Sequence, residues 1–126
     1  MGGNAGTQTL AVAVRAIATN QLTNTNTWRV IGREFRIAVA NGASLGLMMG
    51  LGAGALWHSG PLALVFGSAI LINNLVAGLA GIMVPVTLDR LRVDPAVSSA
   101  VFVTMATDVM GFFSFLGLAV LSGLAA

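Results

Sequence analysis

Residues 101–121, VFVTMATDVMGFFSFLGLAVL, decide the fold class and raise a question about function. The stretch is almost wholly apolar and lacks the period-two alternation of a transmembrane β-strand, which indicates a membrane-spanning helix. A carboxylate, Asp108, stands near its middle. A charge at mid-span costs about 2.5–3.5 kcal/mol on insertion scales, and such groups usually line ion or proton paths. We therefore expect Asp108 to face a water-filled ion path.

The composition indicates that the whole chain lies in a membrane. Of the 126 residues, 56% are hydrophobic and 8% are charged, and residues 37–88 contain no Asp, Glu, Lys or Arg. This uncharged length is about twice the roughly 20 residues that one helix needs to cross a bilayer. A soluble protein of this size could not bury so much apolar surface. We predict an integral, multi-pass protein of the cell (inner) membrane, with the lipid bilayer as a partner.

The apolar segments predict an all-α fold, a bundle of four transmembrane helices of which the first is truncated. Asp94 is a plausible N-cap for the last helix, and Pro95 suits its first position. The first segment is too short for a lipid-facing span, so it is either a half-helix buried in protein or, as we prefer, the end of a longer helix. One transmembrane domain, residues 1–126, is expected, with helices over about residues 3–19, 28–57, 62–88 and 95–125.

The basic residues predict the orientation of the chain. There is no lysine, and all six arginines fall on one side if the four helices alternate in direction. By the positive-inside rule this side is cytoplasmic, so both termini of the chain are expected on the extracytoplasmic side. We attribute the basic pI to arginines that mark the cytoplasmic side of the membrane, and we expect no nucleic-acid partner. The arginines are Arg15, Arg29, Arg33, Arg36, Arg90 and Arg92.

Three of these arginines, Arg29, Arg33 and Arg36, have the i, i+4, i+7 spacing of one helix face. The simpler interpretation is a solvated collar that contacts lipid headgroups. The alternative is a docking surface for a cytosolic domain.

Small residues predict close helix packing. Four glycines in the second segment follow one another at four-residue spacing, the pattern that lets membrane helices approach closely. Ala77 and Gly81 repeat this spacing in the third segment. The neighbouring Asn73 and Asn74 either line the path or satisfy backbone groups freed near Pro85, and the sequence does not separate these roles. The glycines are Gly42, Gly46, Gly50 and Gly54.

Polar side chains on the same helix as Asp108, and others in the first segment, are the candidate ligands. On a helix, Thr104, Thr107 and Gly111 fall on the same side as Asp108. In the first segment Asn4, Thr7 and Gln8 stand at i, i+3, i+4 on one face. Interhelical hydrogen bonding explains the latter three residues equally well.

These oxygen donors are hard, which disfavours soft metals. Magnesium sheds water reluctantly and is often held through its waters with one or two carboxylates, so two chains around a twofold axis would suit it. A proton or sodium path fits the same chemistry. The chain has no cysteine and one histidine, His58, in a turn, so we expect no enzyme.

Three stretches resemble the membrane domain of the MgtE-type magnesium channels: GGNAGTQTLAVAVRAIAT, NLVAGLAGIMVP and LDRLRVDPAVSSAVFVTMATDVMGFF. The likeness runs through almost the whole chain, and its motifs are specific. Similar proteins have five membrane helices, so the chain looks like the second to the fifth, with the second cut short. The resemblance implies a homodimer, in which a second copy of the chain completes an ion path along the subunit interface.

The resemblance also implies site residues. The family's pore aspartate falls on Asp108, which contacts hydrated Mg²⁺, and a helping backbone carbonyl one turn earlier falls on Thr104. The asparagine of the GGNAG motif falls on Asn4, and Thr7 is a further auxiliary ligand. Asp94 matches a position near the cytosolic mouth where regulatory magnesium bridges to the soluble domain.

Family members usually also have an N-terminal cytosolic domain, a pair of CBS modules and a first membrane helix. This sequence does not contain them, and the resemblance implies that they are partners of the domain in a longer parent chain. The expected function is conduction of hydrated Mg²⁺, with Mn²⁺ and Co²⁺ left open, through a path centred on Asp108. The alternatives are a proton- or sodium-coupled carrier that uses Asp108 and a non-conducting structural helical module in which Asp108 locks two helices together.

Overall fold

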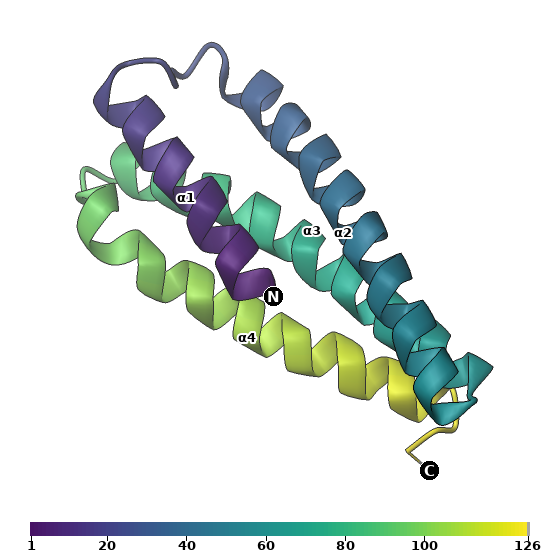
Figure 1. The fold of residues 1–126 in the computed structure, drawn as a ribbon. Helices are drawn as coiled ribbons and strands as arrows, with labels where there is room; N and C mark the ends of the chain where they lie inside the picture. The colour runs from purple at the N-terminus through teal and green to yellow at the C-terminus, as the bar shows by residue number, and fades with distance from the viewer. Residues whose placement is uncertain (126) are drawn as a thin grey trace.

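The computed structural model describes residues 1–125, which contain four α-helices and no strand. The helices form an elongated bundle (Figure 1). The predicted all-α fold is therefore confirmed. The helices are α1 (Gly2–Ala18), α2 (Thr27–Trp57), α3 (Gly60–Arg90) and α4 (Pro95–Leu121).

The helix ends follow local sequence signals. Ser59 begins α3, since its side chain accepts a hydrogen bond from the Leu62 N–H at 3.3 Å. Asp94 begins α4 as predicted, because its Oδ1 accepts from the Ala96 N–H at 3.0 Å and Pro95 occupies the first turn. α2 ends at Trp57 and is capped by His58, which adopts the left-handed conformation with φ of 49°. The two-residue turn between α2 and α3 makes these helices antiparallel neighbours.

Close approach of backbones holds α2 against α3. A Cβ placed on Gly46 would lie 2.6 Å from the carbonyl oxygen of Gly67, and one on Gly50 would lie 2.7 Å from that of Ala63. Only glycine fits at such distances, so the predicted packing role of the four-residue glycine stripe is confirmed.

Glycines also allow α1 to pack closely against α3 and α4. A Cβ on Gly81 of α3 would lie 2.9 Å from the carbonyl oxygen of Gly6, and one on Gly6 would lie 2.7 Å from Val103 Cγ1 of α4. Ala77, one turn before Gly81, is fully buried. Gly6 thus lies at the point where α1, α3 and α4 meet.

Three helices, α2, α3 and α4, are long and apolar enough to cross a membrane. α2 carries an exposed tryptophan at each end, Trp28 and Trp57. At 1.5 Å per residue they lie about 44 Å apart along the axis, close to the full thickness of a bilayer with its headgroups. Tryptophan is enriched at both membrane interfaces, so this spacing fits a membrane-spanning α2.

All six arginines lie in or close to the α1–α2 and α3–α4 connections in sequence. In Figure 1 both connections lie at one end of the bundle, and the α2–α3 turn and the C-terminus lie at the other. Met1 lies near the middle of the bundle in the same view. We call the first end, with residues 19–26 and 91–94, the arginine end.

Candidate functional site

Asp108 lies near the middle of α4 and its side chain is exposed on the outer surface of the bundle. Within residues 1–125 it takes part in no hydrogen bond and no ion pair. An interhelical lock formed inside one chain would need a partner for this carboxylate. The single chain therefore leaves Asp108 available to a group outside it.

Large apolar side chains surround Asp108 on the exposed surface of α4. Val101 is 70% exposed, Val109 60% and Phe112 71%. A carboxylate inside an apolar, lipid-facing surface is costly, because charged residues in membrane helices almost always face the protein interior or water. This surface therefore requires a cover that also supplies water or a counter-charge.

Thr104 and Thr107 separate in the structure. Thr104 is exposed on the Asp108 side of α4, whereas Thr107 is 1% exposed. The prediction that Thr107 shares the side of Asp108 is wrong, since consecutive helix residues differ by about 100° and Thr107 faces Gly3 of α1. Its hydroxyl donates to the Thr104 carbonyl at 2.9 Å.

Gly111 also departs from the predicted side. A Cβ on Gly111 would lie 3.1 Å from Asn73 Nδ2 of α3, so this residue faces α3. The Asn73 Oδ1 atom is buried and has no hydrogen-bond partner within residues 1–125. Asn74 donates from Nδ2 to the Ile70 carbonyl at 2.9 Å. Ile70 precedes Asn74, whereas Pro85 follows it. The Asn74 side chain therefore does not satisfy a backbone group freed near Pro85.

The polar residues of α1 are exposed at the level of Asp108. Gly3 lies next to Thr107, with 3.7 Å between a Cβ built on Gly3 and Thr107 Oγ1. Asn4 follows Gly3 and Asp108 follows Thr107, so these two exposed residues stand at the same height in the bundle. Thr7 donates from its hydroxyl to the Asn4 carbonyl at 3.0 Å.

Gln8 differs from Asn4 and Thr7 because it lines a cavity between α1 and α2. All three residues are exposed on α1 at the predicted helical spacing, and Gln8 in addition borders the cavity.

Asp94 lies apart from the other candidate ligands. It is exposed at the arginine end and caps α4. Asp108 follows Asp94 by fourteen positions, a rise of about 21 Å along α4 at 1.5 Å per residue. The two carboxylates cannot bind one ion together.

Within residues 1–125 no three His, Cys, Asp or Glu side chains gather to form a metal-binding group. One chain alone therefore offers a dehydrated ion too few charged ligands. Its exposed oxygen donors near Asp108 suit a cation that retains its water shell.

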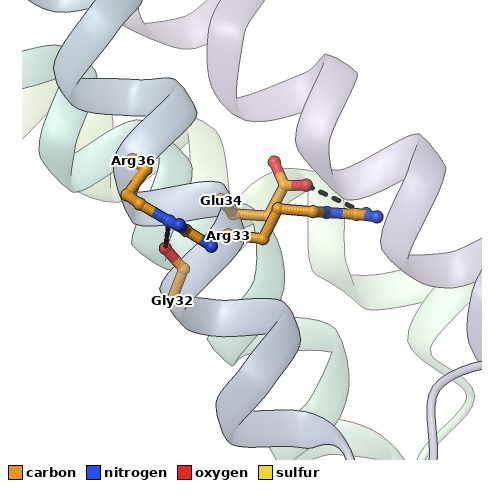
Figure 2. A network of polar contacts seen from close by, with 4 residues as sticks. All are labelled: Gly32, Arg33, Glu34 and Arg36. Carbon is orange, nitrogen blue, oxygen red and sulfur yellow. Dashed lines mark hydrogen bonds and ion pairs between the residues drawn. The ribbon is translucent and has the colours of Figure 1, made fainter.

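Glu34 was not identified from the sequence; it is 8% exposed and lies in the half of α2 nearer the arginine end. Its Oε1 accepts from Arg33 Nη2 at 3.3 Å (Figure 2). A signal for its burial exists: the four-residue glycine stripe, continued backward from Gly42, passes through Ala38 to Glu34. A Cβ on Gly78 of α3 would lie 3.6 Å from the Glu34 carbonyl oxygen, so Glu34 belongs to the α2–α3 contact.

The MgtE family, described as a divalent cation transporter, matches residues 1–118. The chain is 39% identical over 117 residues to "Magnesium transporter MgtE" of Enterococcus faecalis, and 35% identical over 119 residues to the protein of that name in Thermus thermophilus. A third relative with the same name, from Bacillus subtilis, is 29% identical over 120 residues.

These alignments cover 93–94% of this chain but 26% of each relative. The chain spans about a quarter of the length of the curated relatives that it matches. The family match extends from α1 through most of α4 and includes Asn4, Asp94 and Asp108. On this match over most of its length, the chain belongs to the MgtE family of divalent cation transporters.

Proposed function

We propose that this chain is the membrane domain of a magnesium transporter that conducts hydrated Mg²⁺ between two copies of itself, with Asp108 of each copy at the centre of the path. Thr104 and Asn4 assist through water or directly, and Thr7 supports Asn4. Asp94 acts separately at the arginine end.

One observation carries the proposal: Asp108 is exposed and unpartnered within residues 1–125, in the middle of an apolar helix surface. Contact with lipid is energetically unfavourable for this carboxylate. A second copy related by a twofold axis would cover the apolar residues with the same surface and bring a second Asp108 opposite the first.

The charges then balance. Two carboxylates match the double charge of Mg²⁺, and hydroxyl and amide groups hydrogen-bond to its water ligands. Magnesium dehydrates reluctantly and commonly uses one or two carboxylates, so a sparse site of this kind fits it. The names of the relatives, all magnesium transporters, support the same choice of ion.

The arginines support an orientation for this path. With the arginine end on the cytoplasmic side of the cell membrane, Asp94 stands at the cytoplasmic mouth and the C-terminal end of α4 faces outward. The N-terminus, also expected outside, lies near the middle of the bundle. In the longer relatives further segments accompany the matched region, and such segments are the expected partners of this end.

The direct test is Mg²⁺ uptake into proteoliposomes that contain the chain, read with an internal Mg²⁺-sensitive dye. Asp108→Asn removes the charge with little change of shape and should lower uptake by at least about tenfold. Asp89→Asn is the matched control, since Asp89 is an exposed carboxylate at the arginine end of α3. Uptake in the control should stay within about twofold of wild type.

Two arms separate the alternatives. Collapse of the proton gradient with an ionophore, and replacement of Na⁺ by choline, should leave Mg²⁺ uptake unchanged if the path is a channel. Dependence on either gradient would favour a coupled carrier. Equal uptake by wild type and Asp108→Asn would exclude Asp108 as the centre of the path.

A further inference from the structure

A cleft runs between α1 and α2, starting at the arginine end and leading toward the middle of the bundle. Two adjoining cavities of about 450 Å³ and 330 Å³ form it, and Val12, Arg33 and Glu34 line both. The outer cavity is also bordered by Arg15 and by Gln21 of the α1–α2 connection. The Arg33–Glu34 pair therefore lies where the two cavities join.

Glu34 holds Arg33 at this junction. The Glu34 side chain is 10% exposed, whereas that of Arg33 is 59% exposed, and 3.3 Å separates Nη2 from Oε1. Figure 2 shows the Arg33 side chain extended from α2 on the side of the neighbouring α1 ribbon. A guanidinium has five N–H donors in a planar fork. The bond to Glu34 occupies one of them, which leaves the others available to an acceptor in the cleft.

The mouth of the cleft carries net positive charge. Arg15 and Arg33 contribute two positive charges against the one negative charge of Glu34. This balance disfavours a divalent cation and favours an anion. A phosphate group is the matching ligand, because its oxygens accept several N–H bonds from an arginine fork at once.

The walls of the cleft are suited to a lipid tail. Val30 and Ile82 border the outer cavity, and Ala5, Val12 and Ile37 border the inner one. The cleft lies between two helices of a membrane-embedded bundle, at the end where the arginines mark the membrane interface. Basic pockets between membrane helices on the cytoplasmic side are known to hold anionic headgroups.

Two amide side chains lie deeper in the cleft than Arg33. Gln8 of α1 and Asn41 of α2 border the inner cavity beyond Arg33. Their N–H₂ groups can donate hydrogen bonds to ester carbonyls of a lipid whose phosphate is at Arg33. The inner cavity thus offers hydrogen-bond donors together with an apolar wall.

The geometry points to a binding site for one anionic phospholipid in the α1–α2 cleft, with its phosphate between Arg33 and Arg15 and its acyl chains along the apolar wall. Arg33 is the main contact and Glu34 positions it. The site does not involve Asp108 and does not depend on the proposed transport function.

Native mass spectrometry of the purified chain, released from detergent with phosphatidylglycerol or phosphatidylcholine added, tests this site. Wild type should retain one phosphatidylglycerol per chain in preference to phosphatidylcholine. Arg33→Gln should weaken phosphatidylglycerol binding by at least about tenfold. Arg92→Gln removes the same charge from the α3–α4 connection, outside the cleft, and should weaken binding by at most about fivefold, the general contribution of one arginine near a membrane.

Two further arms complete the test. Inorganic phosphate at millimolar concentration should not displace the lipid, and displacement would show a site for free phosphate in place of a lipid site. Arg15→Gln serves as the second variant if Arg33→Gln fails to fold by circular dichroism, and it should also exceed the loss in Arg92→Gln. Equal losses in the cleft variants and in Arg92→Gln would overturn the proposal, because they would reduce it to general surface attraction.

Discussion

The Thr107 hydroxyl donates a hydrogen bond to the backbone carbonyl of Thr104, with 2.9 Å between the two oxygens. Thr107 is buried against α1, whereas Thr104 is exposed on the side of Asp108. A group fixed by helix packing thereby contacts the carbonyl one turn before the proposed pore carboxylate. This bond therefore joins a side chain that packs on α1 to a backbone carbonyl near the proposed path.

Thr107→Val removes the hydroxyl and keeps the side-chain volume. The lost hydrogen bond should lower the free energy of unfolding by about 0.5–1.5 kcal/mol, measured by denaturation in mixed detergent micelles. Mg²⁺ uptake should change as well, since the Thr104 carbonyl then has one donor fewer competing for its lone pairs. Thr107→Ser keeps the hydroxyl and should retain uptake. The same uptake in the Val and Ser variants would show that this bond has no role in the path.

Gly46→Ala should separate α2 from α3. The new Cβ would lie 2.6 Å from the Gly67 carbonyl oxygen, and backbone atoms cannot move aside as a flexible side chain can. We expect a loss of about 1–3 kcal/mol in the free energy of unfolding. Gly52→Ala, also in α2, is the control, because no atom lies within 4 Å of its added Cβ. It should be neutral or slightly stabilising, and an equal loss in both variants would argue against the close contact.

Gly81→Ala should displace α1 from α3. Its Cβ would lie 2.9 Å from the Gly6 carbonyl oxygen and 2.7 Å from Thr9 Cβ. Because α1 carries Asn4, the displacement should reduce Mg²⁺ uptake in addition to stability. Gly32→Ala, with open space around the added Cβ, provides the comparison. Uptake can be measured in the liposome assay, and unchanged uptake in Gly81→Ala would mean that the position of α1 does not matter to the path.

Asp94 allows its capping role to be separated from its charge. Asp94→Ala removes the acceptor for the Ala96 N–H and should cost about 0.5–2 kcal/mol of stability, whereas Asp94→Asn keeps an acceptor and should cost little. If Asp94 also binds magnesium at the cytoplasmic mouth, Asp94→Asn should weaken Mg²⁺ binding there by isothermal titration. Wild-type binding in a stable Asp94→Asn variant would limit Asp94 to helix capping.

The helices could be predicted from the sequence because apolar runs of sufficient length, bounded by Ser59 or Asp94, leave the backbone few alternatives in a membrane. The contact role of Gly46 and Gly50 was equally predictable, since a four-residue stripe of glycines has little other use. In both cases the signal is local, and one helix carries all of it.

The placement of side chains around Asp108 was less predictable. Thr107 and Gly111 fall within the same half of a helical wheel as Asp108, but the packing of α1 and α3 decides which of them is buried. Glu34 was missed because a charge beside three arginines resembles a solvated surface, and its burial depends on Gly78 of another helix. Such contacts depend on where neighbouring helices cross, which one sequence does not state.

We propose that Asp108 faces a hydrated cation across the interface between two copies of the chain. The most direct measurement is a structure of the protein in a lipid environment with Mg²⁺ present. We expect a twofold dimer in which density for a hydrated ion lies between the two Asp108 carboxylates. A dimer with both Asp108 side chains turned to lipid, or paired with other protein groups away from any water, would contradict it.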